Sequence, residues 1–98
     1  MPLVRPDMRW LALLVVLAAC ATEAPPTAEL ASARAAVAQA GPVAEYAPKE
    51  LAAAQTKLTA AQQALARGDN VQARRLAQQA EVDARLAWAL SENERSRP

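Results

Sequence analysis

The sequence predicts an all-α protein, either a short Ala-rich antiparallel helical hairpin or a three-helix bundle, within residues 28–98. Ala accounts for 27 of the 98 residues, and Leu, Gln, Glu and Arg add further good helix formers. No run of β-branched residues interrupts them. Gly41 with Pro42, and then Gly68, divide this part of the chain into three helical segments.

The first nineteen residues differ from the rest and are typical of an export signal. Arg5 and Arg9 give this segment a positive start, and residues 10–19 then contain no charge. Ten residues of helix cover about 15 Å, which is half of a hydrocarbon core of roughly 30 Å. We therefore expect residues 1–19 to be a cleaved signal peptide and not a membrane span.

The apolar run ends in a motif that resembles the lipobox of bacterial lipoproteins: Leu17, Ala18, Ala19 and Cys20. In that motif the first three residues are recognised by the signal peptidase, and the Cys20 sulfur is the atom that takes the lipid. The resemblance implies a mature chain that begins at Cys20 and carries several fatty acyl chains, such as palmitate, which hold far more firmly than one chain. The alternatives are a secreted protein with a chance Cys at its cleavage site and an uncleaved anchor.

Residues 20–27 are short, polar and Pro-containing, which is the composition of a tether. Ala21 follows Cys20 at the position where, in the enterobacterial sorting pattern, an Asp retains lipoproteins in the inner membrane. We therefore expect a lipid anchor on the outer membrane that faces the periplasm, with the folded part close to the membrane surface.

The three expected helices span about residues 28–40, 48–67 and 70–95. Pro42 stops the first helix because it lacks a backbone donor and forces its predecessor out of the α region. Pro48 suits the N1 position of the second helix. Gly68 suits the left-handed C′ position that ends this helix, and Asp69 with Gln72 resembles a capping box for the third helix.

Each segment carries apolar residues in steps of three and four, a pattern that predicts one packed face for each helix. The predicted core residues are Leu30, Ala33, Val37 and Ala40 in the first helix, Leu51, Ala54, Leu58, Ala61 and Leu65 in the second, and Ala73, Leu76, Ala80, Ala84 and Ala87, with Val82, Leu86 and Leu90 widening the apolar arc, in the third. The short link at Gly68 predicts an antiparallel hairpin in which the numbers of facing residues add up to roughly 137. This register places Leu51 near Leu86, and Leu65 near Ala73.

Tyr46 and Trp88 are the only aromatic residues after Cys20, and we expect them to meet at the open end of the hairpin. They act either as a plug that closes the bundle or as a contact for a partner, a role that suits Trp and Tyr. Only 13 large apolar side chains follow Cys20. Because such a core is thin, we expect self-association or docking on another envelope protein.

The composition argues against catalysis and against nucleic-acid binding. The chain has no His, no Gly-rich phosphate loop and no metal-ligand spacing. Glu81 and Asp83 point apart on a helix and form no catalytic pair, whereas Glu81 and Arg85 are spaced for an i,i+4 ion pair. A net charge of +1 gives no reason to expect nucleic acid. We predict no enzyme activity, no cofactor, no metal and no small-molecule substrate.

Arg74 and Arg75 form a small basic group on the third helix. Guanidinium groups bind phosphates, so that these residues are candidates for contact with lipid phosphates or with a phosphorylated sugar. The alternative is a solvated helix face whose arginine stems lie over neighbouring residues.

Residues 28–90 resemble the small bacterial envelope lipoproteins grouped as domain of unknown function 4398. The resemblance rests on the lipobox and tether, on residues 46–51 (Tyr-Ala-Pro-Lys-Glu-Leu), on the Ala-Arg-Gly-Asp sequence at 66–69, and on residues 73–81. It implies a helical protein of the cell envelope, and it implies a location and a fold without an activity.

Three functions are consistent with the sequence. The first, which we favour, is a lipid-anchored structural or adaptor protein whose helices pack on themselves or on an envelope protein. The second is a peptide-binding module resembling a single tetratricopeptide-type helix pair, although solenoids usually need three or more repeats. The third is a coiled-coil spacer lipoprotein, although Gly41, Pro42 and Gly68 interrupt a continuous rod.

Overall fold

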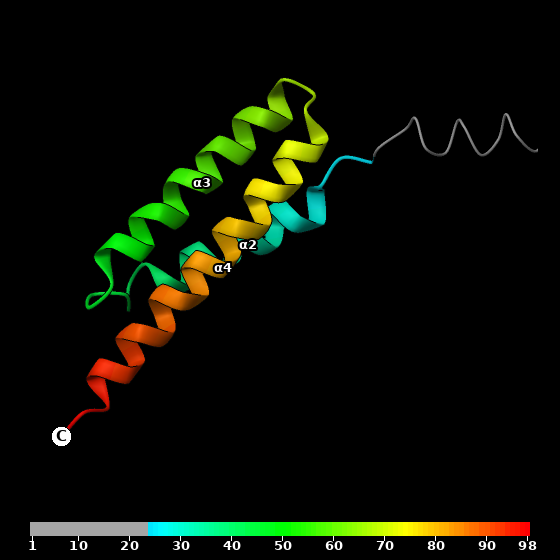
Figure 1. The fold of residues 1–98 in the computed structure, drawn as a ribbon. Helices are drawn as coiled ribbons and strands as arrows, with labels where there is room; N and C mark the ends of the chain where they lie inside the picture. The colour runs from blue at the N-terminus through cyan, green and yellow to red at the C-terminus, as the bar shows by residue number, and fades with distance from the viewer. Residues whose placement is uncertain (1–23) are drawn as a thin grey trace, which may run out of the picture.

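A computed structural model describes residues 24–98, and within that range the chain forms three helices and no strand (Figure 1). They are α2 (Thr27–Ala40), α3 (Pro48–Ala66) and α4 (Asn70–Arg95). The all-α prediction is confirmed, and each helix begins and ends within one residue of its expected range. The predicted signal peptide and Cys20 lie outside the described residues.

The three helices form a small bundle in which α4 packs against both of its neighbours, whereas α2 and α3 touch each other less. α3 and α4 form an antiparallel hairpin, and α2 runs alongside α4 in the same direction (Figure 1). One end of the bundle carries the hinge between α3 and α4, at residues 67–69. The opposite end, which carries the loop at residues 41–47, is called the open end below.

The hinge is a compact helix-to-helix turn that depends on Gly68. Its φ is +80°, the left-handed region that the sequence predicts. The Asp69 N–H donates to the Ala64 carbonyl (2.9 Å) and the Gly68 N–H to the Leu65 carbonyl (2.9 Å), the two bonds of a Schellman motif. The Asp69 carboxylate then accepts from the Gln72 N–H (3.2 Å) and caps α4. The Gln72 side chain bonds Arg75, so that only half of the predicted capping box forms.

The core consists almost entirely of alanine. Toward the open end the buried residues are Ala40, Ala44, Ala47, Ala54, Ala84 and Ala87. Toward the hinge they are Leu30, Ala33, Ala61, Ala77 and Ala80. Because an alanine presents only its Cβ atom, helix axes can approach to the close end of the usual range of about 8–10 Å. The bundle is therefore stabilised by contacts between alanine faces more than by the burial of large side chains.

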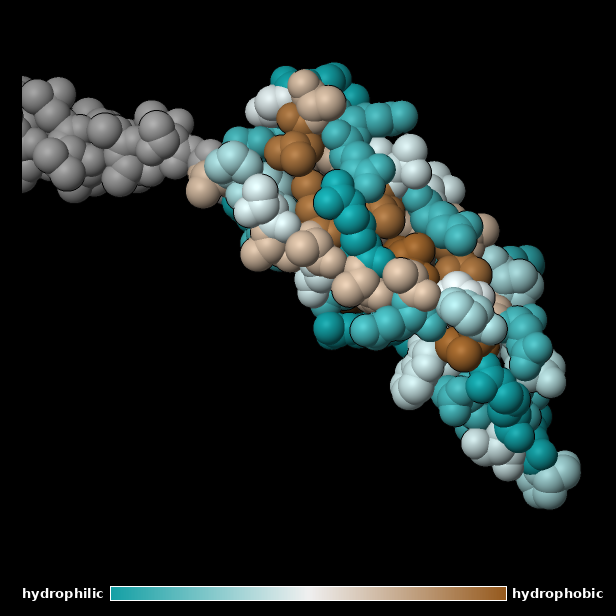
Figure 2. All heavy atoms as spheres, turned by 180° about the vertical axis from the view of Figure 1, so that it is seen from behind, coloured by the Kyte–Doolittle hydropathy of each residue, from teal (hydrophilic) through white to brown (hydrophobic). Residues whose placement is uncertain are grey.

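The larger apolar side chains lie at the margin of this core or outside it. Leu58 and Leu65 are partly buried against the cluster at the hinge end. Val82, Leu86 and Leu90, which were predicted to widen the core, are exposed. Seen from behind, hydrophobic side chains remain visible along the bundle between hydrophilic ones (Figure 2). The alanine seam is too narrow to enclose them.

The hairpin register is close to the prediction, but its detail differs at Leu86. Lys57 Nζ and Asp83 Oδ2 form an ion pair of 2.6 Å between α3 and α4, and their numbers add up to 140. Leu51 packs against the cluster that contains Ala84 and Ala87, whereas Leu86 is 46% exposed. Successive helical residues differ by about 100° in direction. Since Ala87 faces α3, Leu86 turns away from it.

Long-range polar contacts fix the start of α2. At its start, Arg74 Nη2 donates to the Ala24 carbonyl (2.9 Å) and Arg74 Nε lies 3.4 Å from Glu29 Oε2. Pro26 is fully buried, so that the expected tether of residues 20–27 is packed on the bundle from Pro26 onward. Among the described residues, no helix is long and apolar enough to cross a bilayer.

The open end is closed by polar contacts from the last turns of α4. Ser91 is fully buried, and its hydroxyl accepts from the Tyr46 N–H (3.2 Å). Arg95 lies 3.3 Å from a Glu45 carboxylate oxygen and donates to the Val43 carbonyl. These contacts hold the 41–47 loop, whose two buried residues are Ala44 and Ala47, against α4.

Candidate functional site

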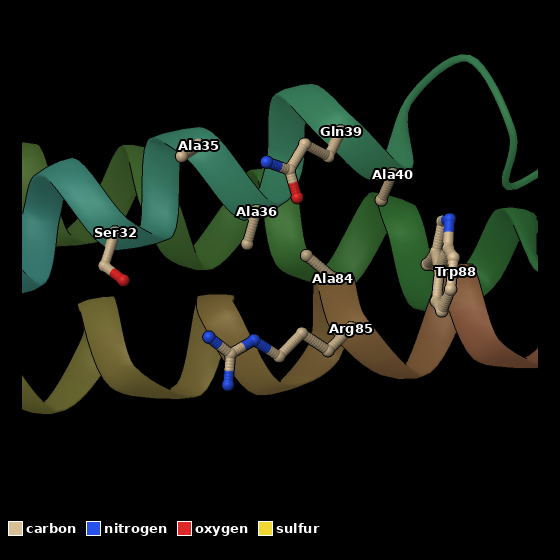
Figure 3. A pocket seen from close by; sticks show the side chains of 8 residues that line it. All are labelled: Ser32, Ala35, Ala36, Gln39, Ala40, Ala84, Arg85 and Trp88. Atoms are coloured by element: carbon tan, nitrogen blue, oxygen red, sulfur yellow. The ribbon is translucent and has the colours of Figure 1, made fainter.

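An open groove of about 330 Å³ lies between α2 and α4 toward the open end. Its lining residues are Ser32, Ala35, Ala36, Gln39 and Ala40 from α2 and Ala84, Arg85 and Trp88 from α4 (Figure 3). The groove exists because four of these residues are alanines, whose short side chains leave space between the two helices. Its volume is near the lower end of the range of about 300–1,000 Å³ that is common for ligand sites.

Trp88 is the one aromatic side chain among the lining residues of the groove, and it stands at one end of it, beside the last turn of α2 (Figure 3). The sequence predicted that Trp88 would lie with Tyr46 at the open end of the hairpin, and the structure places Trp88 on the side of α4 that faces α2. The side of α4 that faces α3 carries Asp83 and Ala87. Trp88 follows Ala87 by one position and therefore turns about 100° further round the helix, toward α2.

Tyr46, the second predicted contact residue, does not line this groove. The Tyr46 N–H donates to the hydroxyl of Ser91, which lies one turn beyond Trp88 on α4. Both aromatic residues therefore lie at the same end of the bundle. Tyr46 is 55% exposed and Trp88 is 48% exposed. A plug that closes the bundle would be buried, so that these exposures favour contact with a partner over a plug.

The polar groups of the groove are few and uncharged apart from one arginine. Ser32 and Gln39 supply a hydroxyl and an amide from α2, and Arg85 supplies a guanidinium from α4. Arg85 forms the predicted i,i+4 ion pair with Glu81 (2.6 Å), with its side chain 71% exposed. The groove therefore offers an aromatic surface, a floor of methyl groups and hydrogen-bonding groups at its edges. This combination suits the side chains of a protein or peptide partner.

Outside this groove, residues 24–98 hold no metal-binding cluster, and a second groove is mainly polar. No group of three or more acidic, Cys or His side chains is placed there to hold a metal ion. A second open groove, of about 320 Å³, lies between α3 and α4 and is lined mainly by polar side chains: Lys57, Arg75, Gln78, Gln79, Val82 and Asp83. Lys57 and Asp83 are already paired with each other in it.

The two arginines that the sequence grouped together have different surroundings. Arg74 is partly buried between α4 and α2, where it holds Glu29 and Ala24. Arg75 is exposed and donates to the Gln72 side chain. Only Arg75 therefore remains a candidate for an external phosphate, because the Arg74 guanidinium has a structural role.

Sequence reasoning missed several residues that shape the groove and its surroundings. Arg74 and Glu29 fix the angle of α2 on α4, but they lie 45 positions apart and carry no local signal. The burial of Ser91 could have been predicted from the sequence, because Ser91 continues the spacing of the small residues Ala80, Ala84 and Ala87 along α4. Cys20 and its preceding recognition residues, Leu17, Ala18 and Ala19, lie outside the described residues.

Residues 28–97 match one family model, whose description is Domain of unknown function (DUF4398). No curated protein and no solved structure matches the chain. The matched range covers all but the first residue of α2, and all of α3 and α4.

Proposed function

This chain belongs to the domain of unknown function 4398 family, and we propose that it is a lipid-anchored envelope protein with a structural or adaptor role. In this proposal, lipid on Cys20 holds the protein on the outer membrane, facing the periplasm. The helical bundle then presents the groove at Trp88 to a partner, either an envelope protein or a second copy of the chain. The protein has no catalytic role in this proposal.

The observation that carries the proposal is the sequence that ends in Cys20. An uncharged run of ten residues follows two arginines, and Leu17, Ala18 and Ala19 come directly before the Cys. Cys20 is also the only Cys of the chain. A single Cys in an exported protein would otherwise be a free thiol or an intermolecular bridge, and lipidation accounts for it without either.

The start of the folded region supports close attachment to a membrane. Ala24 and Pro26 are already held on the bundle. Four residues of extended chain, from Cys20 to Ala24, span at most about 14 Å. A lipid on Cys20 would therefore keep the bundle within a short distance of the headgroups, where a partner must also lie.

The adaptor role is supported by the exposed aromatic residue in the groove. Trp and Tyr are enriched among the residues that dominate binding energy at protein interfaces. Half of the Trp88 side chain is exposed in a bundle whose core is otherwise made of alanine. The hairpin at Gly68 folds the chain back on itself, which weighs against the continuous rod of a spacer lipoprotein.

The proposal is tested by removing the lipid acceptor in the native host. We expect Cys20→Ala to abolish the mass of the acyl chains and to move the protein from the membrane fraction to the soluble periplasm, or to stall its processing. Membrane fractionation and mass spectrometry of the purified product measure both effects. Thr22→Ala, two residues further on, is the matched control and should fractionate as the wild type. A bare thiol at Cys20 in the wild-type product would refute the proposal.

A further inference from the structure

Three side chains at the hinge end of the bundle are exposed: Arg67, Val71 and Arg75. Arg67 follows the last residue of α3, and Val71 and Arg75 lie one turn apart on the same side of α4. Val71 is 62% exposed, although it is apolar. Among the described residues, neither Arg67 nor Arg75 forms an ion pair with a carboxylate. We call these three residues the hinge-end surface.

The N-terminal segment joins the bundle at this same end. The Ala24 carbonyl accepts from Arg74, in the second turn of α4, and Pro26 is fully buried next to it in the sequence. Figure 1 shows this segment beside the start of α4, with the C-terminus at the far end of the same helix. The direction of α2 is therefore fixed with its first residue toward the hinge.

The length of chain before Ala24 decides which end of the bundle a membrane anchor can bring to the lipid. Four Cα-to-Cα steps lead from Cys20 to Ala24, a reach of at most about 14 Å. Trp88 lies about 26 Å further along α4 than Val71, at a rise of 1.5 Å per residue. An anchor at Cys20 thus draws the hinge end toward the headgroups and leaves Trp88 and the open end further away.

The charges at the two ends of the bundle fit the same orientation. At the hinge end, Arg67 and Arg75 are available to lipid phosphates, which guanidinium groups bind with two parallel hydrogen bonds. An exposed apolar residue beside cations is typical of surfaces that lie among lipid headgroups. At the open end, by contrast, Arg95 and Arg97 are already paired with the carboxylates of Glu45, Glu92 and Glu94.

We propose that the hinge-end surface docks on phospholipid headgroups, with Arg67 and Arg75 on their phosphates and Val71 in the interface between headgroups and acyl chains. The bundle then stands on the membrane by its hinge and presents the groove at Trp88 away from the bilayer. This inference rests on the proposed lipid anchor at Cys20. It adds a second, weaker contact that sets the orientation of the bundle.

The test compares tryptophan fluorescence at the two ends of the bundle. Trp10 lies in the predicted signal peptide, so that Trp88 is the only tryptophan of the predicted mature chain. The lipidated protein is reconstituted in vesicles of phosphatidylethanolamine and phosphatidylglycerol that carry a quencher on their headgroups. We expect a several-fold stronger quenching in a Val71→Trp, Trp88→Phe variant than in the wild type. Circular dichroism of both proteins checks that the helical fold is unchanged.

A second set of variants isolates the arginines. In the Val71→Trp, Trp88→Phe background, Arg67→Gln with Arg75→Gln should reduce the quenching, although the anchor still keeps it above the wild-type level. Arg34→Gln is the control, because Arg34 is an exposed arginine of α2 outside the hinge-end surface. Equal quenching at both ends, in protein that floats with the vesicles, would overturn the docking surface and leave the anchor intact. Protein that does not float with the vesicles would overturn both proposals.

Discussion

Gly68 is the residue whose backbone conformation no other amino acid adopts without cost. A Cβ atom built there would meet no atom within 4 Å, so that the cost of a side chain is purely conformational. We expect Gly68→Ala to lower the free energy of unfolding by about 1–2 kcal/mol, the penalty of a left-handed L-residue. Urea denaturation followed by circular dichroism measures this change as a shift of the midpoint.

The second glycine provides the control for this experiment. Gly41 has a φ of −48°, and its Cβ would lie 3.5 Å from the Val37 carbonyl oxygen, an ordinary contact. Gly41→Ala should therefore be neutral or stabilise the protein by up to about 1 kcal/mol, because it restricts the unfolded chain. If both substitutions had the same effect, the hinge would not depend on the left-handed conformation of Gly68.

Residues differ in how far the sequence predicts their roles. Gly68 and Asp69 were predicted because a hinge and a helix cap are determined by neighbours within a few positions. The Ser91 and Arg74 contacts were not, because their partners lie 45 or more positions away. Their geometry exists only after the helices have packed.

At the scale of the helix, α4 has two opposed apolar faces of different composition. The inner face consists of Ala73, Ala77, Ala80, Ala84 and Ala87, followed by Ser91. The outer face carries Val82 and Leu86, which are 63% and 46% exposed. The sequence prediction, which considered hydrophobicity alone, placed these larger residues in the core. In the structure the inner face of α4 is occupied by alanines and Ser91, and the larger residues Val82 and Leu86 lie outside it.

Substitution of Ala77 tests whether the close approach of the helices is essential. Ala77→Leu places three extra carbon atoms in the seam between α4 and its neighbours, where Ala77 has no exposed surface. Overpacking of this kind typically costs about 1–3 kcal/mol. We expect a lower thermal unfolding midpoint by circular dichroism. Ala89→Leu, the same change at an exposed position of α4, should leave the midpoint nearly unchanged, and equal losses would contradict an alanine seam.

At the scale of the whole molecule, the three-helix arrangement was one of two predicted folds. Local sequence patterns predicted the helices and the hairpin, but they did not determine where α2 would lie. Its position depends on Glu29, Arg74 and Leu30, which join α2 to the rest of the bundle. The groove at Trp88 follows from that position and could not be predicted without it.

The proposed adaptor role predicts a specific crosslinking pattern in intact cells. A photoreactive amino acid at position 88 should yield a defined adduct, either with one envelope protein or with a second copy of the chain. The same amino acid in place of Gln62, which is exposed on α3, should yield none. Immunoblotting and mass spectrometry identify the adducts. Equal labelling from both positions, or none from position 88, would argue against a partner at the groove.

The parallel course of α2 and α4 has a mechanical consequence. The described chain begins beside the second turn of α4, where Ala24 contacts Arg74, and Trp88 lies toward the other end of α4. Tension between the anchor and a partner held at Trp88 would act along both helix axes, so that it would shear their interface and would not peel it apart. Under shear, the Glu29–Arg74 pair and the alanine contacts bear the force together. A bundle with parallel α2 and α4 would therefore resist tension between a membrane anchor and a partner.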